Sequence, residues 1–148
     1  MFAAVNFAAR KGLAEVPAEN AAKAQARRTG VRGETYAYWY LRRHGYILVA
    51  RNYTAPGIKG EIDMVGYDGN TLAFVEVRTR TVRDEMSSLP ELSVTPGKQH
   101  LLARTARHFL AERRVRECPC RFDVVAIDNS PGKPPVVRLH KDAFSPQM

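Results

Sequence analysis

The segment at residues 60–80, GEIDMVGYDGNTLAFVEVRTR, constrains the fold more than any other part of the chain. Two apolar runs flank YDGNT, which is typical of a tight turn, so the segment predicts a β-hairpin. The runs also contain three acidic residues, Glu61, Asp63 and Glu76. Aspartate is disfavoured in strands, and a buried carboxylate is costly unless it is paired or bound to a metal. The hairpin therefore raises the question of what those acids bind.

Helical segments are predicted on both sides of the hairpin. A helix over about 31–44 fits the sequence, because Gly45 follows its end directly. Thr95 and Pro96 form the pattern of an N-cap followed by proline at the first helical position, which predicts a second helix over about 96–114. A long polar connection at 81–95 joins the hairpin to the second helix, and loops of this length are usually functional or disordered.

Three further stretches read as strands: ILVARNYT before the hairpin, and RFDVVAID and VVRLH after the second helix. The predicted order is α-β-β-β-α-β-β, an α/β fold whose helices flank a mixed central sheet. A chain of 148 residues suits one domain, expected here over 19–148 after a poorly ordered tail at 1–18.

Composition narrows the setting in which the protein works. No apolar run approaches the ~18–20 residues of a membrane helix, and the N-terminus lacks the basic segment of a secretory signal. Cys118 and Cys120 are too few for a disulfide scaffold and are interpreted as reduced thiols. We therefore expect a cytoplasmic protein without membrane contact.

The charge is unevenly distributed along the chain. The net charge is +8, but residues 61–100 carry four Lys/Arg against seven Asp/Glu. Residues 1–60 carry ten against three, and residues 101–148 carry nine against five. Basic surface of this kind suits a polyanion such as nucleic acid, although the charge alone favours the plainer interpretation of a solvated surface. The acidic centre is left unexplained by that plain interpretation.

Strand alternation predicts how the hairpin acids are placed. A two-residue turn, either Asp68-Gly69 or Gly69-Asn70, puts Asp63, Glu76 and Arg78 on one face. The second choice pairs Asp63 with Glu76 directly, whereas a three-residue turn would separate them. Glu34 shares a helical stripe with apolar residues and is expected to point inward.

Two neighbouring carboxylates repel each other, and a divalent cation between them removes the conflict. Mg²⁺ favours oxygen ligands, so Asp63 and Glu76, with Glu34 as a third carboxylate, form a candidate metal site. Arg78 would then stabilise charge that develops on a phosphate. Ion pairs with nearby arginines would also explain Asp63 and Glu76, and Glu34 also fits a plain first-turn acid. Glu61 is interpreted as an exposed strand residue or an arginine partner, slightly in preference to a metal ligand.

Five segments, in order, resemble one family: RGETYAYWYLRRHGY, GEIDMV, FVEVRTR, TPGKQHLLARTARHFL and RFDVVAI. They resemble the YraN-type family of small bacterial proteins, itself similar to restriction-endonuclease-like nucleases and archaeal Holliday-junction resolvases. The resemblance covers about residues 30–128. It implies a restriction-endonuclease-like core with Glu34, Asp63, Glu76 and position 78 as catalytic residues.

This chain departs from the nuclease pattern at position 78, where the pattern has lysine and the chain has Arg78. Arginine does not give up its proton in proteins, so this side chain is excluded as a general base. It keeps the ability to position water and to stabilise negative charge.

The sequence thus predicts a Mg²⁺- or Mn²⁺-dependent endonuclease that acts on DNA, in preference to RNA, at branched or repair-type structures. Arg80, Lys98 and Gln99 are predicted to contact nucleic acid, although Lys98 and Gln99 also fit ordinary helix surface. A homodimer would suit an enzyme that cuts two strands. The alternatives are a non-catalytic module that binds nucleic acid or protein on the same fold, and a purely structural protein.

Overall fold

A computed structural model describes residues 32–82 and 94–146 of the chain. The predicted tail at 1–18 and most of the polar connection at 81–95 lie outside the described residues. The described part begins with a helix at residues 32–43. The elements that follow are β1 (Ile47–Thr54), β2 (Glu61–Asp68), β3 (Thr71–Thr81), α3 (Pro96–Glu112), β4 (Cys120–Asn129) and β5 (Val136–Phe144). The five strands form one sheet with the order β1-β2-β3-β4-β5.

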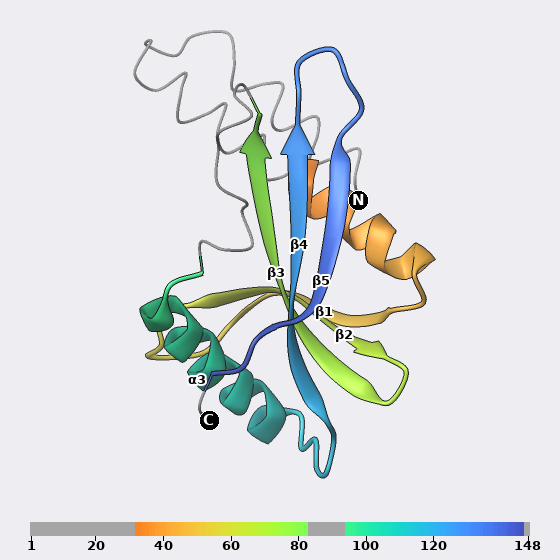
Figure 1. Cartoon of the computed structure of the whole chain (residues 1–148). Coiled ribbons are helices and arrows are strands. Elements are labelled where there is room, and N and C mark those ends of the chain that lie inside the picture. The colour runs from red at the N-terminus through yellow and green to blue at the C-terminus, as the bar shows by residue number, and fades with distance from the viewer. Residues whose placement is uncertain (1–31, 83–93, 147–148) are drawn as a thin grey trace, which may run out of the picture.

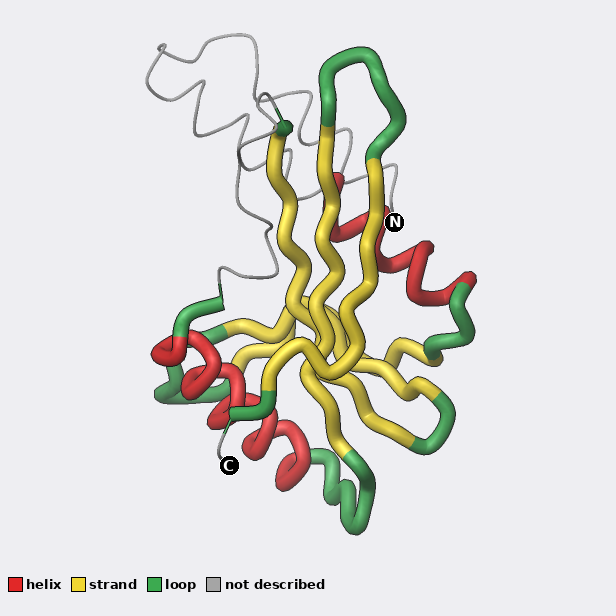
Figure 2. The backbone as a smooth tube through the Cα atoms, viewed as in Figure 1, coloured by secondary structure: helices red, strands yellow, loops and turns green. Residues whose placement is uncertain are grey.

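The sheet is mixed, as predicted. β3 and β4 run parallel, and the other neighbouring strands run antiparallel. The parallel pair requires a crossover, and α3 lies in it, because parallel strands cannot be joined by a tight turn. The sheet is strongly twisted, so that β1 and β2 run across the direction of the other three strands (Figure 2).

The two described helices cover opposite faces of the sheet (Figure 1). Alternate residues of the hairpin therefore face different helices: Val65 and Phe74 pack in the cluster that includes α3. Met64, Ala73 and Val75 pack in the cluster that includes the helix at 32–43. Because both faces of the central strands are covered, these strands are almost continuously apolar rather than alternating.

Gly33 lets the first described helix lie directly on β3. A Cβ atom at this position would lie 2.0 Å from Oγ1 of Thr79, a distance that a real side chain could not tolerate. The contact sets the position of the helix and therefore of Glu34, the residue after Gly33.

The hairpin register resolves the choice of turn. Asp68 pairs with Thr71, so Gly69 and Asn70 form a two-residue turn, with Gly69 at a left-handed φ of 61°. The element order α-β-β-β-α-β-β is confirmed, and its architecture is that of a restriction-endonuclease-like core. Most predicted ends agree within two residues, but β5 continues to Phe144. No helix in the described ranges combines the length and the apolar character that crossing a bilayer requires.

Candidate metal site and nucleic-acid interface

The candidate site begins where β2 and β3 part. Their ladder runs from Asp68–Thr71 to Met64–Val75 and goes no further. Beyond it, Oδ2 of Asp63 accepts a hydrogen bond of 2.8 Å from the backbone N–H of Val77. A carboxylate oxygen of Asp63 therefore accepts the hydrogen bond that a backbone carbonyl of β2 would accept in a continued ladder. The aspartate thus satisfies a β3 backbone N–H at the point where the two strands stop pairing.

Three carboxylates converge at this point. One oxygen each from Glu34, Glu61 and Asp63 lie within 4.8 Å of one another. Glu34 comes from the helix at 32–43, whereas Glu61 and Asp63 are the first and third residues of β2. Glu61 is exposed and the other two are half-buried, so the cluster is reachable from solvent.

The electrostatics of the cluster favour the arrival of a positive charge. Burial, and then the charge of Glu76, raises the pKa of Asp63 to about 7, although the hydrogen bond from Val77 opposes the shift. Burial and the charge of Glu61 likewise raise the pKa of Glu34, against the effect of Arg51. Both carboxyls hold protons more tightly than usual, and a cation would relieve the same repulsion.

Glu76 lies next to the cluster but is bound differently. Its side chain is only 6% exposed, and its Oε1 lies 2.6 Å from Nζ of Lys98 and 3.8 Å from Nε of Arg78. Lys98 comes from the first turn of α3, which Thr95 caps by accepting a hydrogen bond from the N–H of Lys98. A buried glutamate therefore lies between two cations from different elements.

The other predicted nucleic-acid contacts are held by the protein itself. Arg80 makes two hydrogen bonds to Asp128, of 2.8 and 3.2 Å, and Arg138 binds the same carboxylate. Gln99 donates a hydrogen bond from Nε2 to the carbonyl of Val94. Contact of Arg80 or Gln99 with nucleic acid stays a prediction, and any such contact would compete with these bonds.

Five of the predicted residues fall into two groups, and Arg80 and Gln99 belong to neither. Glu34 and Asp63 meet in the carboxylate cluster, and Glu76, Arg78 and Lys98 meet beside it. Glu61 was set aside in the sequence interpretation, yet it completes the cluster. Alternation along β2 could have indicated it, because residues 61 and 63 share a face. The ion pair of Lys98 with Glu76 had no local sign, since the two residues are 22 positions apart.

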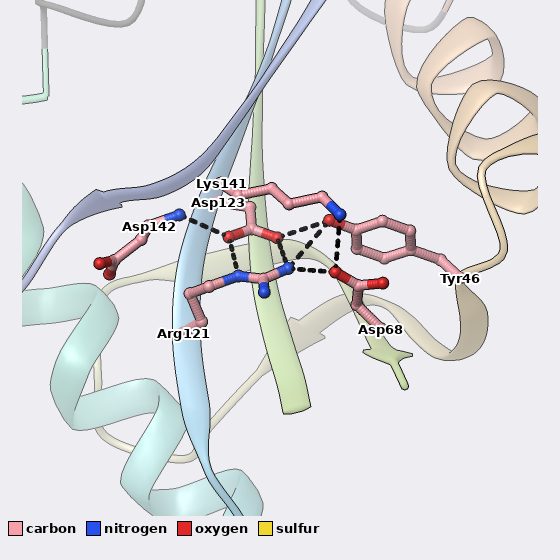
Figure 3. A network of polar contacts seen from close by, with 6 residues as sticks. All are labelled: Tyr46, Asp68, Arg121, Asp123, Lys141 and Asp142. Atoms are coloured by element: carbon pink, nitrogen blue, oxygen red, sulfur yellow. Dashed lines mark hydrogen bonds and ion pairs between the residues drawn. The ribbon is translucent and has the colours of Figure 1, made fainter. Parts of the chain in front are cut away.

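A second group of acids in the protein is already neutralised (Figure 3). Asp123 is fully buried and receives hydrogen bonds from Tyr46, Arg121 and the backbone N–H of Asp142. Asp68 pairs with the same arginine at 2.8 Å and with Lys141 at 2.9 Å. This network joins the hairpin turn to β4 and β5, and no cation is needed to complete it.

The cluster of Glu34, Glu61 and Asp63, called the open cluster below, suits a hard divalent cation. All of its ligand atoms are carboxylate oxygens, which Mg²⁺ and Mn²⁺ prefer over sulfur or nitrogen. Mg²⁺ is typically held by one or two carboxylates with water and substrate phosphates filling its other positions. Glu34 and Asp63 could supply the protein ligands, with Glu61 or Glu76 as a further one.

Comparison with known proteins finds similarity to one protein family. The family model described as "Uncharacterised protein family UPF0102" matches residues 33–127. A UPF0102 protein of Koribacter versatilis is 44% identical over 117 residues, 79% of each chain. Those of Geotalea uraniireducens and Symbiobacterium thermophilum are 39% and 41% identical, over 82% and 80% of this chain and 93% and 98% of their own.

Proposed function

The chain belongs to the UPF0102 family, and we propose that it is a metal-dependent nuclease that hydrolyses phosphodiester bonds in DNA. The membership confirms the YraN-type resemblance. The observation that carries the proposal is the convergence of Glu34, Glu61 and Asp63 within 4.8 Å, beside the buried Glu76.

The carboxylates would hold Mg²⁺ or Mn²⁺ at the point where β2 and β3 part. Such an ion polarises a phosphate oxygen and lowers the pKa of a bound water. Hydrolysis would form a bond from the water oxygen to phosphorus and break the bond to the leaving sugar oxygen. The water would release a proton to solvent, and the leaving oxygen would take one up from solvent. Asp63 is fixed for this task by its bond to Val77, so it needs little reorganisation on binding.

Arg78 would act through its charge alone. It lies two residues after Glu76 on β3, and strand alternation places both on one face. Its guanidinium matches the geometry of phosphate oxygens and stays protonated throughout the reaction. It therefore suits stabilisation of the transition state and does not suit proton abstraction.

The outer side of α3 would bind the DNA backbone. Arg104 and Arg107 are exposed on this helix, and they follow Lys98 by six and nine residues. Contacts of this kind read no sequence, which suits an enzyme that recognises the shape of a branched or repair-type DNA.

A homodimer would let two such sites cut two strands. A cytoplasmic location, expected from the sequence, is part of the same proposal.

Calorimetry with Mg²⁺ and Mn²⁺ tests the site without any assumption about substrate. We expect saturable binding by the natural protein and none by Asp63→Asn. Cleavage of branched and single-stranded DNA that requires either metal, and disappears in Asp63→Ala and Glu76→Ala, would support the enzyme. Failure of both metals to bind the natural protein would refute the proposal.

A second candidate function is a binding module on the same fold. It is favoured by Arg78, which stands where the nuclease pattern has lysine. The module predicts DNA binding that weakens steeply with salt, with no metal-dependent cleavage of any substrate. The two functions are therefore separated by one cleavage assay across DNA structures, done in parallel with a salt titration of binding.

A further inference from the structure

The first turn of α3 carries a lysine to the most buried carboxylate of the candidate site. Nζ of Lys98 lies 2.6 Å from Oε1 of Glu76, although 39% of the lysine side chain is exposed. The side chain therefore reaches from solvent into the site. A substrate that approaches Glu76 along the exposed side of Lys98 would meet the ammonium group.

The position of this lysine is fixed by the start of the helix. Thr95 is the N-cap and Pro96 is the first helical residue, so Lys98 lies in the first turn with its N–H bonded to Oγ1 of Thr95. No acidic residue lies in that turn of α3. Glu76 therefore provides the negative charge that the positive end of a helix favours, and the ion pair joins α3 to β3.

Lysine also differs from Arg78 in what it offers. Its compact ammonium has three donors that rotate freely, whereas the guanidinium of arginine is a rigid planar fork. With one donor on Glu76, two remain for the oxygens of a phosphate group. Arg78 lies farther from Glu76, at 3.8 Å, and its side chain is 26% exposed.

We propose that Lys98 is a catalytic residue of this site, and that α3 delivers to the scissile phosphate the lysine that position 78 does not provide. The proposal rests on the nuclease function proposed above. Glu76 would orient the ammonium group, which would donate to a phosphate oxygen as negative charge develops there. The role uses the charge and the donors of the lysine, with no loss of its proton.

The variant Lys98→Met tests this role because it keeps the length of the side chain and removes its charge. We expect the kcat of Mg²⁺-dependent DNA cleavage to fall by about 10²–10³, as for the loss of one transition-state donor, with KM for DNA changed little. We expect Mg²⁺ to bind roughly tenfold more tightly in calorimetry, because a cation next to the metal site has been removed. Lys98→Arg should recover part of the kcat.

Opposite signs of these two effects separate catalysis from support of the fold. A lysine that only braces Glu76 would, on removal, weaken metal binding and cleavage together, and that result would overturn the proposal. Cleavage by Lys98→Met at the natural rate would overturn it as well, while leaving the nuclease function intact. If the natural protein cuts no DNA with either metal, the nuclease function itself fails and this role fails with it.

Lys133→Met is the matched control, because Lys133 is an exposed lysine in the turn between β4 and β5, outside the candidate site. It should leave kcat, KM for DNA and the affinity for Mg²⁺ unchanged. A tenfold gain in Mg²⁺ affinity in this variant too would show that the effect comes from net charge, and would count against a specific role for Lys98.

Discussion

Two groups of acids in this protein use similar residues for different ends. In the network around Asp123, the carboxylates of Asp68 and Asp123 face the cations of Arg121 and Lys141, so charge is balanced within the protein. In the cluster of Glu34, Glu61 and Asp63, three carboxylates meet within 4.8 Å. The pKa of Asp68 is lowered by its partners, whereas that of Asp63 is raised by burial and its neighbours.

The supply of counter-charge, more than burial, distinguishes the neutralised acids of the network from the acids of the cluster, whose negative charge is in excess. Asp123 is more buried than Asp63, yet it is fully hydrogen-bonded. A satisfied buried network stabilises one arrangement of the strands. A cluster of acids with an excess of negative charge stores repulsion, which an incoming cation can relieve.

The largest effect should come from Asp123→Ala. It removes the buried acceptor of the Tyr46 hydroxyl and leaves Arg121 paired with Asp68 alone. Breaking a buried ion pair typically costs about 3–5 kcal/mol of unfolding free energy, and the remaining pair with Asp68 puts the expected loss at the lower end of that range. Urea denaturation measures the loss. Asp142→Asn is the control, because only the backbone N–H of Asp142 bonds to Asp123, and it should change stability by under about 0.5 kcal/mol. Equal effects of the two variants would contradict the structural role of the network.

Gly33→Ala should act on the open cluster and spare the network. The new methyl group would collide with Thr79, so the helix or the Thr79 side chain must shift, at a cost of about 1–3 kcal/mol. Since Glu34 follows Gly33, Mg²⁺ binding in calorimetry should weaken as well. Gly97→Ala is the control, because a Cβ there meets nothing within 4 Å, and it should leave metal binding unchanged. Unaltered metal binding in Gly33→Ala would argue against Glu34 as a ligand.

Asp63→Asn should stabilise the metal-free protein, the reverse of the effect at Asp123. The folded state holds the proton of Asp63 up to about pH 7, whereas the unfolded chain loses it near pH 4. Stability of the natural protein should therefore fall as pH rises through this window, and the variant should lack that fall. We expect a gain of about 1–2 kcal/mol at pH 8 in urea denaturation without metal. A net loss at pH 8 would break the contrast between the two groups.

The smallest effect concerns Asp128, which Arg80 and Arg138 neutralise. Hydrogen bonds from Arg80, and then from Arg138, lower the pKa of Asp128 to about 2. Its contribution to stability is thus fully present above about pH 4 and is lost as pH falls through about 2. Asp128→Asn should cost about 1 kcal/mol at pH 7 and much less at pH 2, by thermal unfolding. An equal cost at both pH values would show that packing, not charge, is responsible.

The helices and strands of this protein follow from short-range sequence signals. The hairpin turn, the Thr95-Pro96 helix start and the apolar runs depend on neighbours in the chain, so their bounds agree closely with the structure. The sequence also indicated Asp63 and Glu76 as candidate site residues, because acidic side chains are disfavoured inside strands. Whether the predicted ligands hold a metal stays a prediction.

Which acids and cations meet depends on how the strands and helices pack together. Glu61 joined the cluster because β2 does not pair with β3 before Met64, and Lys98 reached Glu76 because α3 lies in the connection between two parallel strands. Arg80 paired with Asp128 across the β3–β4 register, 48 residues away. Such contacts depend on strand register and helix placement, which arise from packing of the whole core and leave no mark in any short stretch of sequence.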